Sequence, residues 1–470
     1  MSEKIQLNQK ENAQRELILT GNVFFTILKI GFPIAIFQIL NQLFRLFDTF
    51  MAAGISAEAA SMVAYFSQMN LVVASIGSGL AIATALKIGL AYGQGSYEQV
   101  RKMIGSIFAF VGLLCFMFAI VIIPGATPFL RFIGTPPEFI IAGRGFFVVE
   151  FLTTLLMFFN VIYIAIEKAQ GNSKRILKLN LVSMVIKISL TITAVYVFDA
   201  GIAFLAASTM ASQIFIFGIG IYHLTSKKSE VFRFSPKHIE LSKRVLRPII
   251  YAALPIIFSH MIFNLGKTVI NTMLISYGPL VVGASGIGGL LAGASTMLQF
   301  GMKEAAVTVM TQNRGAGQIN RVFQTFKSLI LINCVAAAIV FVPLWLFAYQ
   351  ITGIFAINDP EFHAILLPIY RYMIFNVWSF ILLTSSNALF LAFGYTKILS
   401  FLATSTLFLF RIPLLWLFEA FTTVGSEVAG LVMMYSNFLT IIPTLIFLFF
   451  VVRRIRNASG NKNEETLLES

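Results

Sequence analysis

Long uninterrupted apolar segments recur along the chain, from Val23 almost to Val452. A helix of about 20 apolar residues crosses the ~30 Å hydrocarbon core of a bilayer. Backbone groups in lipid must be hydrogen-bonded internally, which leaves helices or a closed barrel. Because the apolar residues are continuous and do not alternate with a period of two, the pattern excludes a barrel. The composition agrees, with 58% hydrophobic and 11% charged residues. The sequence therefore predicts an all-α polytopic membrane protein.

The apolar segments predict twelve transmembrane helices. They cover roughly residues 22–53, 59–92, 102–124, 141–168, 175–197, 200–223, 248–277, 283–312, 323–351, 363–393, 397–420 and 425–452. Lysine and arginine gather in the segment before the first helix and in the connections after the even-numbered helices, whereas acids prevail in the other connections. By the positive-inside rule both termini face the cytoplasm. We expect the protein in the plasma (inner) membrane.

The two halves of the sequence match each other when they are shifted by 222 to 224 residues. Pro33 then falls on Pro255, Asn41 on Asn264, Asp48 on Asn271, and AQGNSK from Ala169 on AFGYTK from Ala392. Each half holds six predicted helices, an even number, so the halves are parallel repeats. We predict a cytoplasmic tail at 1–21, an N-lobe at 22–224, a basic cytoplasmic linker at 225–247, a C-lobe at 248–452 and a polar tail at 453–470.

Several motifs in these repeats resemble those of the multidrug and toxic compound extrusion (MATE) family. They are the proline that opens each lobe, LFDT in the first helix, AQGNSK and AFGYTK after the fourth and tenth helices, and FRIPL in the eleventh. The resemblance covers roughly residues 22–450, and the wider superfamily also holds lipid-linked oligosaccharide flippases. It implies a secondary exporter that works by alternating access, with its substrate site between the lobes near the midplane of the membrane.

Polar residues recur at helical spacing in three of the predicted helices. A charge at the bilayer centre costs about 2.5–3.5 kcal/mol on the lenient insertion scale, so such residues normally face the interior of the bundle. The stripes and the other deep charged residues predict a substrate cavity lined by Gln38, Asn41, Arg45, Glu150, Asn180, Asn264, Lys267, Asn271 and Arg411. Hydrogen bonding between helices is the alternative interpretation of each stripe.

Asp48 is the predicted ion-coupling residue, because the family carries an acid in this motif that takes part in cation coupling. Desolvation raises the pKa of a carboxylic acid and nearby cations lower it, so such a group can titrate as its surroundings change. Where the resemblance implies an asparagine and an aspartate in the fifth helix, this sequence has Lys187 and Thr191. We therefore expect a proton rather than sodium as the coupling ion, Lys187 as partner of Asp48, and no cofactor or metal.

Two kinds of cargo fit this pattern. The leading hypothesis is a proton-coupled antiporter that exports amphipathic drugs or other small organic molecules. The alternative is an exporter or flippase of an anionic metabolite or a lipid-linked, phosphate-bearing precursor, because the predicted cavity is rich in lysine and arginine.

No convergent catalytic set is present, so we do not expect an enzyme. The loop asymmetry accounts for most of the net charge of +14, and no nucleic-acid partner is needed. The expected partners are a small-molecule substrate and the lipid bilayer, with the protein as a monomer.

Pro33 and Pro255 occupy equivalent places in the two repeats. A proline in the first turn, where the helix enters the membrane, is the simpler interpretation. The alternative is a hinge, because an internal proline removes an amide donor and bends the helix. Such a hinge would let the first helix respond to protonation of Asp48.

Overall fold

The computed structural model describes residues 7–55, 57–196, 202–226, 229–356 and 359–460. Within 44–61 and at Ala64 the backbone is described for all but residue 56, but the side chains lie outside the described residues. Arg45 and Asp48 fall in that stretch, so the predictions for their side chains remain predictions.

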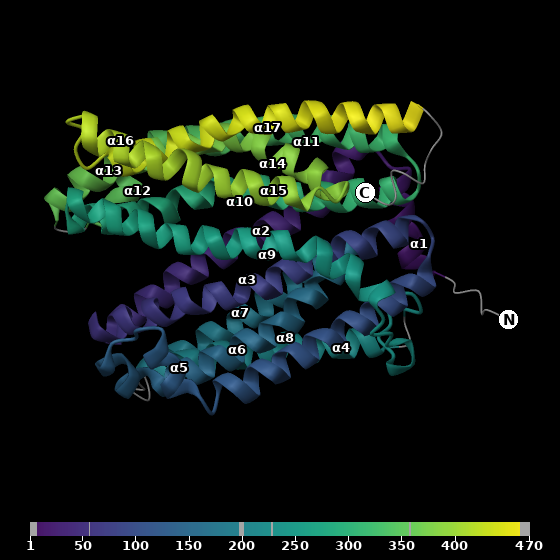
Figure 1. The fold of residues 1–470 in the computed structure, drawn as a ribbon, viewed down its shortest axis with the longest axis horizontal. Coiled ribbons are helices and arrows are strands. Elements are labelled where there is room, and N and C mark those ends of the chain that lie inside the picture. The colour runs from purple at the N-terminus through teal and green to yellow at the C-terminus, as the bar shows by residue number, and fades with distance from the viewer. Residues whose placement is uncertain (1–6, 56, 197–201, 227–228, 357–358, 461–470) are drawn as a thin grey trace. The chain divides into compact units, whose positions relative to one another are not determined.

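The part of the chain that the structure describes contains twelve candidate membrane spans, as the sequence predicted (Figure 1). They are formed by α2 (Val23–Ile55), α3 (Ala57–Gly93), α4 (Tyr97–Ile122), α6 (Pro137–Ala169), α7 (Ser173–Tyr196), α8 (Ile202–Thr225), α9 (Lys243–Leu274) with η2 (Ile275–Tyr277), α10 (Pro279–Gly315), α11 (Ile319–Leu346), α13 (Pro360–Ile374) with α14 (Asn376–Ala392), α15 (Thr396–Ser405) with η3 (Thr406–Arg411) and α16 (Ile412–Phe421), and α17 (Val428–Gly460). Short helices α1 (Gln9–Leu19), α5 (Ala126–Phe132), α12 (Ala348–Gly353) and η1 (Pro236–His238) lie between or before them.

Several helices extend beyond the apolar segments that predicted them. α9 begins at Lys243, before the predicted start at 248, and α17 continues to Gly460, beyond the predicted end at 452. Hydropathy marks only the part of a helix that lies in hydrocarbon, whereas lysine and arginine prolong helices into the headgroup region. The predicted tail at 453–470 therefore begins as helix.

The tenth and eleventh spans are not regular helices. The tenth is divided between α13 and α14 at Phe375, where the Asn376 side-chain amide donates to the backbone carbonyl of Met373 at 2.9 Å. A side chain that hydrogen-bonds to its own backbone competes with the helical ladder. The eleventh contains η3, a π-helical segment that ends at Arg411. Short π-helical segments are rare and often occur at functional positions.

The chain forms two compact units. Unit 1 comprises the residues up to Leu17 together with Leu43–Ile257, and unit 2 comprises Ile18–Gln42 together with the chain from Phe258. α2 and α9 are thus each divided between the units, so the packing units do not coincide with the predicted lobes. The lobe boundaries describe a sequence repeat, which is a different property, and they remain a prediction.

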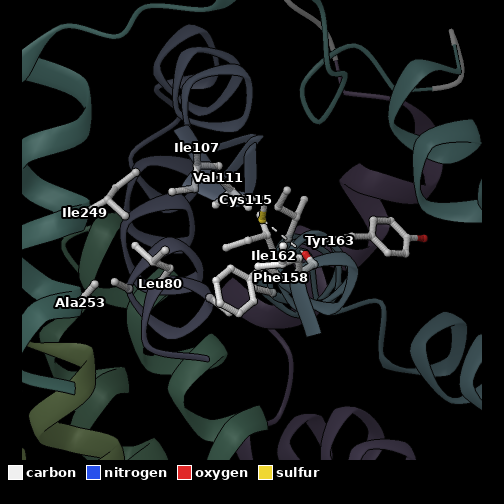
Figure 2. Packing of buried hydrophobic residues seen from close by; sticks show 14 of the residues in the cluster. Leu80, Ile107, Val111, Cys115, Phe158, Ile162, Tyr163, Ile249 and Ala253 are labelled. Atoms are coloured by element: carbon white, nitrogen blue, oxygen red, sulfur yellow. Dashed lines mark hydrogen bonds between the residues drawn. The ribbon is translucent and has the colours of Figure 1, made fainter. Parts of the chain in front are cut away.

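In unit 1 the core lies between α3, α4, α6 and the first turns of α9. Figure 2 shows Leu80, Ile107, Phe158 and Ile249 pointing toward one another from these four helices. In unit 2, one face of α2 is completely buried against α10, and Ile30 and Ile34 are among its core residues. Small residues permit close approach of membrane helices.

Gly301 on α10 lies directly against Ala35 on α2. A Cβ atom at position 301 would lie 2.5 Å from both the Cβ atom and the backbone nitrogen of Ala35. A contact this short with backbone atoms cannot be relieved by moving a flexible side chain. The two helices would therefore have to separate.

We expect Gly301→Ala to lower the melting temperature of the purified protein, at a cost of about 1–3 kcal/mol for overpacking. Gly289→Ala is the matched control, because it lies on the same helix and a Cβ atom there meets nothing within 4 Å. Thermal unfolding in detergent measures both variants. Equal melting temperatures for the two would show that α2 and α10 do not pack as described.

Candidate functional site

Glu150 and Asn180 lie in unit 1, on α6 and α7. Glu150 is half-buried, and its Oε1 atom accepts a hydrogen bond from the Ser67 hydroxyl of α3 at 3.1 Å. Asn180 is buried, but its amide donates to the carbonyl of Ile176 in its own helix at 2.8 Å. The structure thus joins Glu150 to a neighbouring helix, whereas the Asn180 amide is bonded within its own.

Lys187 and Thr191 lie on successive turns of α7. Lys187 is half-buried. The Thr191 side chain is 1% exposed, and its hydroxyl makes no hydrogen bond with any residue that the structure describes. A buried hydroxyl that makes no hydrogen bond costs about 1–3 kcal/mol, so its position calls for a functional explanation. The predicted pairing of Lys187 with Asp48 lies outside the described residues.

Gln38 on α2 and Glu304 on α10 are brought together in unit 2. The Gln38 amide donates to Glu304 Oε1 at 3.0 Å, and both side chains are half-buried. Asn41, in the next turn of α2, is also half-buried. Next to Glu304 along the chain, Lys303 places its ammonium 4.9 Å from the centroid of the Phe300 ring. Glu304 was not among the predicted site residues, although it is an isolated acid in a long apolar helix and could have been chosen on that signal.

The predicted stripe on α9 runs from the interior of unit 2 to its surface. Asn264 is half-buried, whereas Lys267 and Asn271 are exposed. The Lys267 ammonium lies 5.2 Å from the centroid of the Phe263 ring, a cation–π distance. The role of these residues in lining a substrate cavity remains a prediction.

Arg411, at the end of η3, is 4% exposed and lies inside unit 2. Its Nε atom donates to the Ser436 hydroxyl at 3.1 Å, and its Nη2 atom donates to Asn437 Oδ1 at 3.3 Å. The Asn437 amide in turn donates to Asn376 Oδ1 at 2.9 Å. Among the described residues the Arg411 side chain has no carboxylate within 4.0 Å. The structure therefore holds a buried cation by neutral groups of α17, one of which, Asn437, is bonded in turn to Asn376 of α14.

A second buried polar network in unit 2 was not predicted. The Gln299 amide of α10 donates to the carbonyls of Asn333 at 3.3 Å and Val377 at 3.0 Å. The Asn333 amide of α11 donates to the hydroxyls of Thr384 at 3.0 Å and Ser385 at 3.1 Å. These contacts join α10, α11 and α14 by hydrogen bonds between helices, one of the forces that associate membrane helices. The signal in the sequence that could have predicted this network was an amide residue, Gln299 or Asn333, within a long apolar segment.

Both predicted hinge prolines lie inside helices. α2 begins at Val23 and α9 at Lys243, so Pro33 and Pro255 are several turns from the starts of their helices. The simpler interpretation, a first-turn proline, is therefore wrong. Pro33 was already well inside the predicted segment that starts at 22, and α9 begins at Lys243, before its predicted start at 248, which places Pro255 still deeper in its helix. The role of these prolines as hinges remains a prediction.

Twelve candidate spans with charged side chains held inside the bundle indicate a membrane transporter, because intramembrane charges normally mark a substrate or ion pathway. The family model described as MatE matches the chain twice, at residues 33–193 and 255–417. The two matches begin 222 positions apart and end 224 apart, which is the offset of the internal repeat. The chain belongs to this family, multidrug and toxic compound extrusion.

Proteins and structures similar to this chain agree with that family. "Probable multidrug resistance protein YoeA" of Bacillus subtilis (strain 168) is 22% identical over 358 residues, 74% of this chain and 76% of that protein. A structure titled "Outward-facing conformation of a multidrug resistance MATE family transporter of the MOP superfamily" superposes with a TM-score of 0.88 at 16% identity, over 96% of this chain and 99% of that one.

A third similar structure is titled "Reverse polarity of binding pocket suggests different function of a MOP superfamily transporter from Pyrococcus furiosus Vc1 (DSM3638)". It superposes with a TM-score of 0.87 at 17% identity, over 97% of this chain and 99% of that one. At these identities the two superpositions support the shared fold only. The family assignment makes the protein a multi-pass membrane transporter and not an enzyme.

Asn437 supports the buried Arg411 guanidinium, and we expect Asn437→Leu to destabilise the protein. The substitution leaves Arg411 Nη2 and Asn376 Oδ1 without their bonds, at a cost of about 1–3 kcal/mol for a buried unpaired group. Thr444→Val on the same helix is the control, because the Thr444 hydroxyl bonds only to the Thr440 carbonyl of its own helix. A melting temperature that falls no further in Asn437→Leu than in the control would argue against the network.

Pro33 is expected to act as a hinge in transport. Pro33→Ala restores a backbone amide donor, so it should reduce the transport rate while substrate binding stays unchanged. Pro443→Ala is the control, because Pro443 also lies inside a helix, α17, but has no equivalent proline in the first half of the sequence. Flux into proteoliposomes and equilibrium binding of the same substrate separate the two effects. Normal transport by Pro33→Ala would remove the hinge from the mechanism.

Proposed function

We propose that this protein is a proton-coupled antiporter that exports amphipathic small molecules by alternating access. It would act as a monomer in the plasma membrane, with both termini in the cytoplasm. The basic connections on one side of the predicted spans support this orientation. The multidrug resistance named for the relative in Bacillus subtilis supports the cargo.

Intramembrane carboxylates carry the proposal of proton coupling. Glu150 in unit 1 and Glu304 in unit 2 are both half-buried within spans, and each accepts a hydrogen bond from a neutral side chain, Ser67 or Gln38. A carboxylate in such a place can be held in either protonation state by a small change in its surroundings. Asp48, the acid of the family motif, remains the first candidate for the titrating group, and Glu304 becomes the second.

Lys187 and Thr191 would complete the site around Asp48. An ammonium at position 187 can pair with the ionised carboxylate and release it when the carboxylate takes up a proton. The buried Thr191 hydroxyl, which makes no hydrogen bond in the described structure, is then available one turn away. A fixed cation here opposes a sodium ion, which supports the proton as coupling ion.

The second candidate function is export of an anionic metabolite or a lipid-linked, phosphate-bearing precursor. Arg411 favours it, because this buried cation is held by neutral groups and keeps its positive charge uncompensated by any described carboxylate. Guanidinium groups bind carboxylates and phosphates well. The reversed pocket polarity named for the similar structure from Pyrococcus furiosus concerns that protein, but it makes a change of cargo within this fold a reasonable alternative.

Transport in proteoliposomes under an imposed proton gradient tests both candidates. A cationic dye and an organic anion of similar size are offered to the wild type, Asp48→Asn and Glu304→Gln. We expect gradient-driven movement of the dye, at least a tenfold loss of it in Asp48→Asn, and a smaller loss in Glu304→Gln. Glu361→Gln is the control, because this acid is exposed at the start of α13.

Movement of the organic anion without movement of the dye would favour the anionic cargo. If only the anion moves, the double variant Arg45→Glu/Lys187→Glu should abolish its transport, whereas Lys397→Glu on the surface should not. If the dye moves at the same rate with and without the gradient, or Asp48→Asn retains full coupled transport, proton coupling through Asp48 is wrong.

A further inference from the structure

An apolar crevice opens between α4 and α8 in unit 1. It has a volume of about 230 Å³ and is lined by Phe108, Ala109, Phe159, Phe217, Ile221, Leu224, Thr225 and Phe234. α6 packs against both α4 and α8 and contributes Phe159 to the lining. Figure 1 shows these three helices running alongside one another. Phe234, from the linker between α8 and α9, belongs to the lining.

The lining offers hydrocarbon and aromatic surface with no free polar group. Phe108 lies 6.2 Å from Phe159 and 5.9 Å from Phe234 between ring centroids, and Phe159 lies 5.5 Å from Phe217. The only polar lining side chain is Thr225, whose hydroxyl already donates to the Ile221 carbonyl at 2.8 Å. Ile221 is 43% exposed at the mouth. A crevice several times the ~30 Å³ of a water molecule, and without polar partners, suits a hydrocarbon chain better than water.

The crevice lies at the basic end of its helices. Thr225 is the last residue of α8, and the basic linker follows it directly. The linker is held across α4, because Arg101 donates to the Glu230 carbonyl and the Ser106 hydroxyl donates to the Glu240 carbonyl at 2.9 Å. This places Arg233, next to Phe234 in the chain, on the same side of the membrane as the first turns of α4.

One face of α4 carries both Arg101 and the crevice residue Phe108, which are seven residues apart. The linker crosses this face between them, because a Cβ atom at Gly105 would lie 3.1 Å from the His238 carbonyl oxygen. Seven residues place Arg101 about 10 Å from Phe108 along the helix axis, so Arg101 lies closer to the headgroups than the crevice does. Burial and then Arg101 lower the pKa of His238, with smaller effects of Lys102 and Arg233 in the same direction, while Glu98 opposes them.

Two of these cations are available to a ligand. Lys102 pairs with Glu98 at 3.4 Å and with Glu240 at 3.3 Å. Among the described residues, neither Arg101 nor Arg233 has a carboxylate within 4.0 Å, and the exposed Glu230 contributes only its backbone carbonyl to Arg101. Guanidinium groups bind phosphate oxygens well.

We propose that the crevice binds one acyl chain of an anionic phospholipid from the leaflet on the basic side of the membrane, with its phosphate held by Arg101 and Arg233. The site belongs to unit 1 alone and does not depend on the identity of the transported substrate. Its occupant is a bilayer lipid, because the apolar crevice and the guanidinium groups are arranged in the order of an acyl chain and its headgroup.

Native mass spectrometry of the full-length protein in detergent tests this site. Phosphatidylglycerol and phosphatidylcholine with identical acyl chains are titrated separately, with glycerol 3-phosphate as the soluble headgroup analogue. We expect one site with at least fivefold higher affinity for phosphatidylglycerol, and no binding of glycerol 3-phosphate. Arg101→Gln/Arg233→Gln should reduce the affinity for phosphatidylglycerol to that for phosphatidylcholine.

Two further variants separate the parts of the proposal. Lys397→Gln/Arg453→Gln removes two exposed cations of unit 2 and should leave lipid binding unchanged. Ile221→Trp narrows the mouth of the crevice and should weaken binding of both phospholipids. Equal wild-type affinities for the two lipids, or an unchanged preference in Arg101→Gln/Arg233→Gln, would overturn the headgroup site. Unchanged binding by Ile221→Trp would overturn the acyl-chain site, and tight binding of glycerol 3-phosphate would show a soluble anion site instead.

Discussion

The structure depends on the inability of hydrocarbon to hydrogen-bond. Backbone groups inside the bilayer have to be satisfied within each segment, so every candidate span in the described chain is helical. The same constraint acts on side chains. Arg411, Gln299 and Asn333 are all buried, and each has partners on a neighbouring helix. These three side chains therefore tie helices together, whereas the buried Asn180 amide bonds within its own helix.

Apolar surface alone cannot hold such helices together, because lipid tails are as apolar as leucine side chains. Close packing replaces it, as Gly301 against Ala35 illustrates in unit 2. In unit 1, interlocked aromatic and aliphatic side chains serve the same purpose around Phe158.

The charges inside the two units suggest how one fold can serve different cargo. Glu150 and Glu304 are acids bonded to neutral side chains, whereas Arg411 is a cation held by neutral side chains. The acids suit an exchange of protons, and the arginine suits an anion. Family membership decides between transporter and enzyme, and the proposals for the cargo rest on these charges.

The sequence by itself determined the fold class, the number of spans, the repeat and the family resemblance. Each of these follows from local hydropathy or from residues at a constant offset, such as Pro33 and Pro255, and local properties can be read along the chain. Only the tertiary structure decided which polar residues meet. Gln38 and Glu304 are 266 positions apart, and Arg411 and Asn437 are 26 apart on different helices, so no periodicity could pair them. The tertiary structure also decided where helices begin and end, because helices such as α9 and α17 continue past the apolar segments into the polar boundary of the membrane.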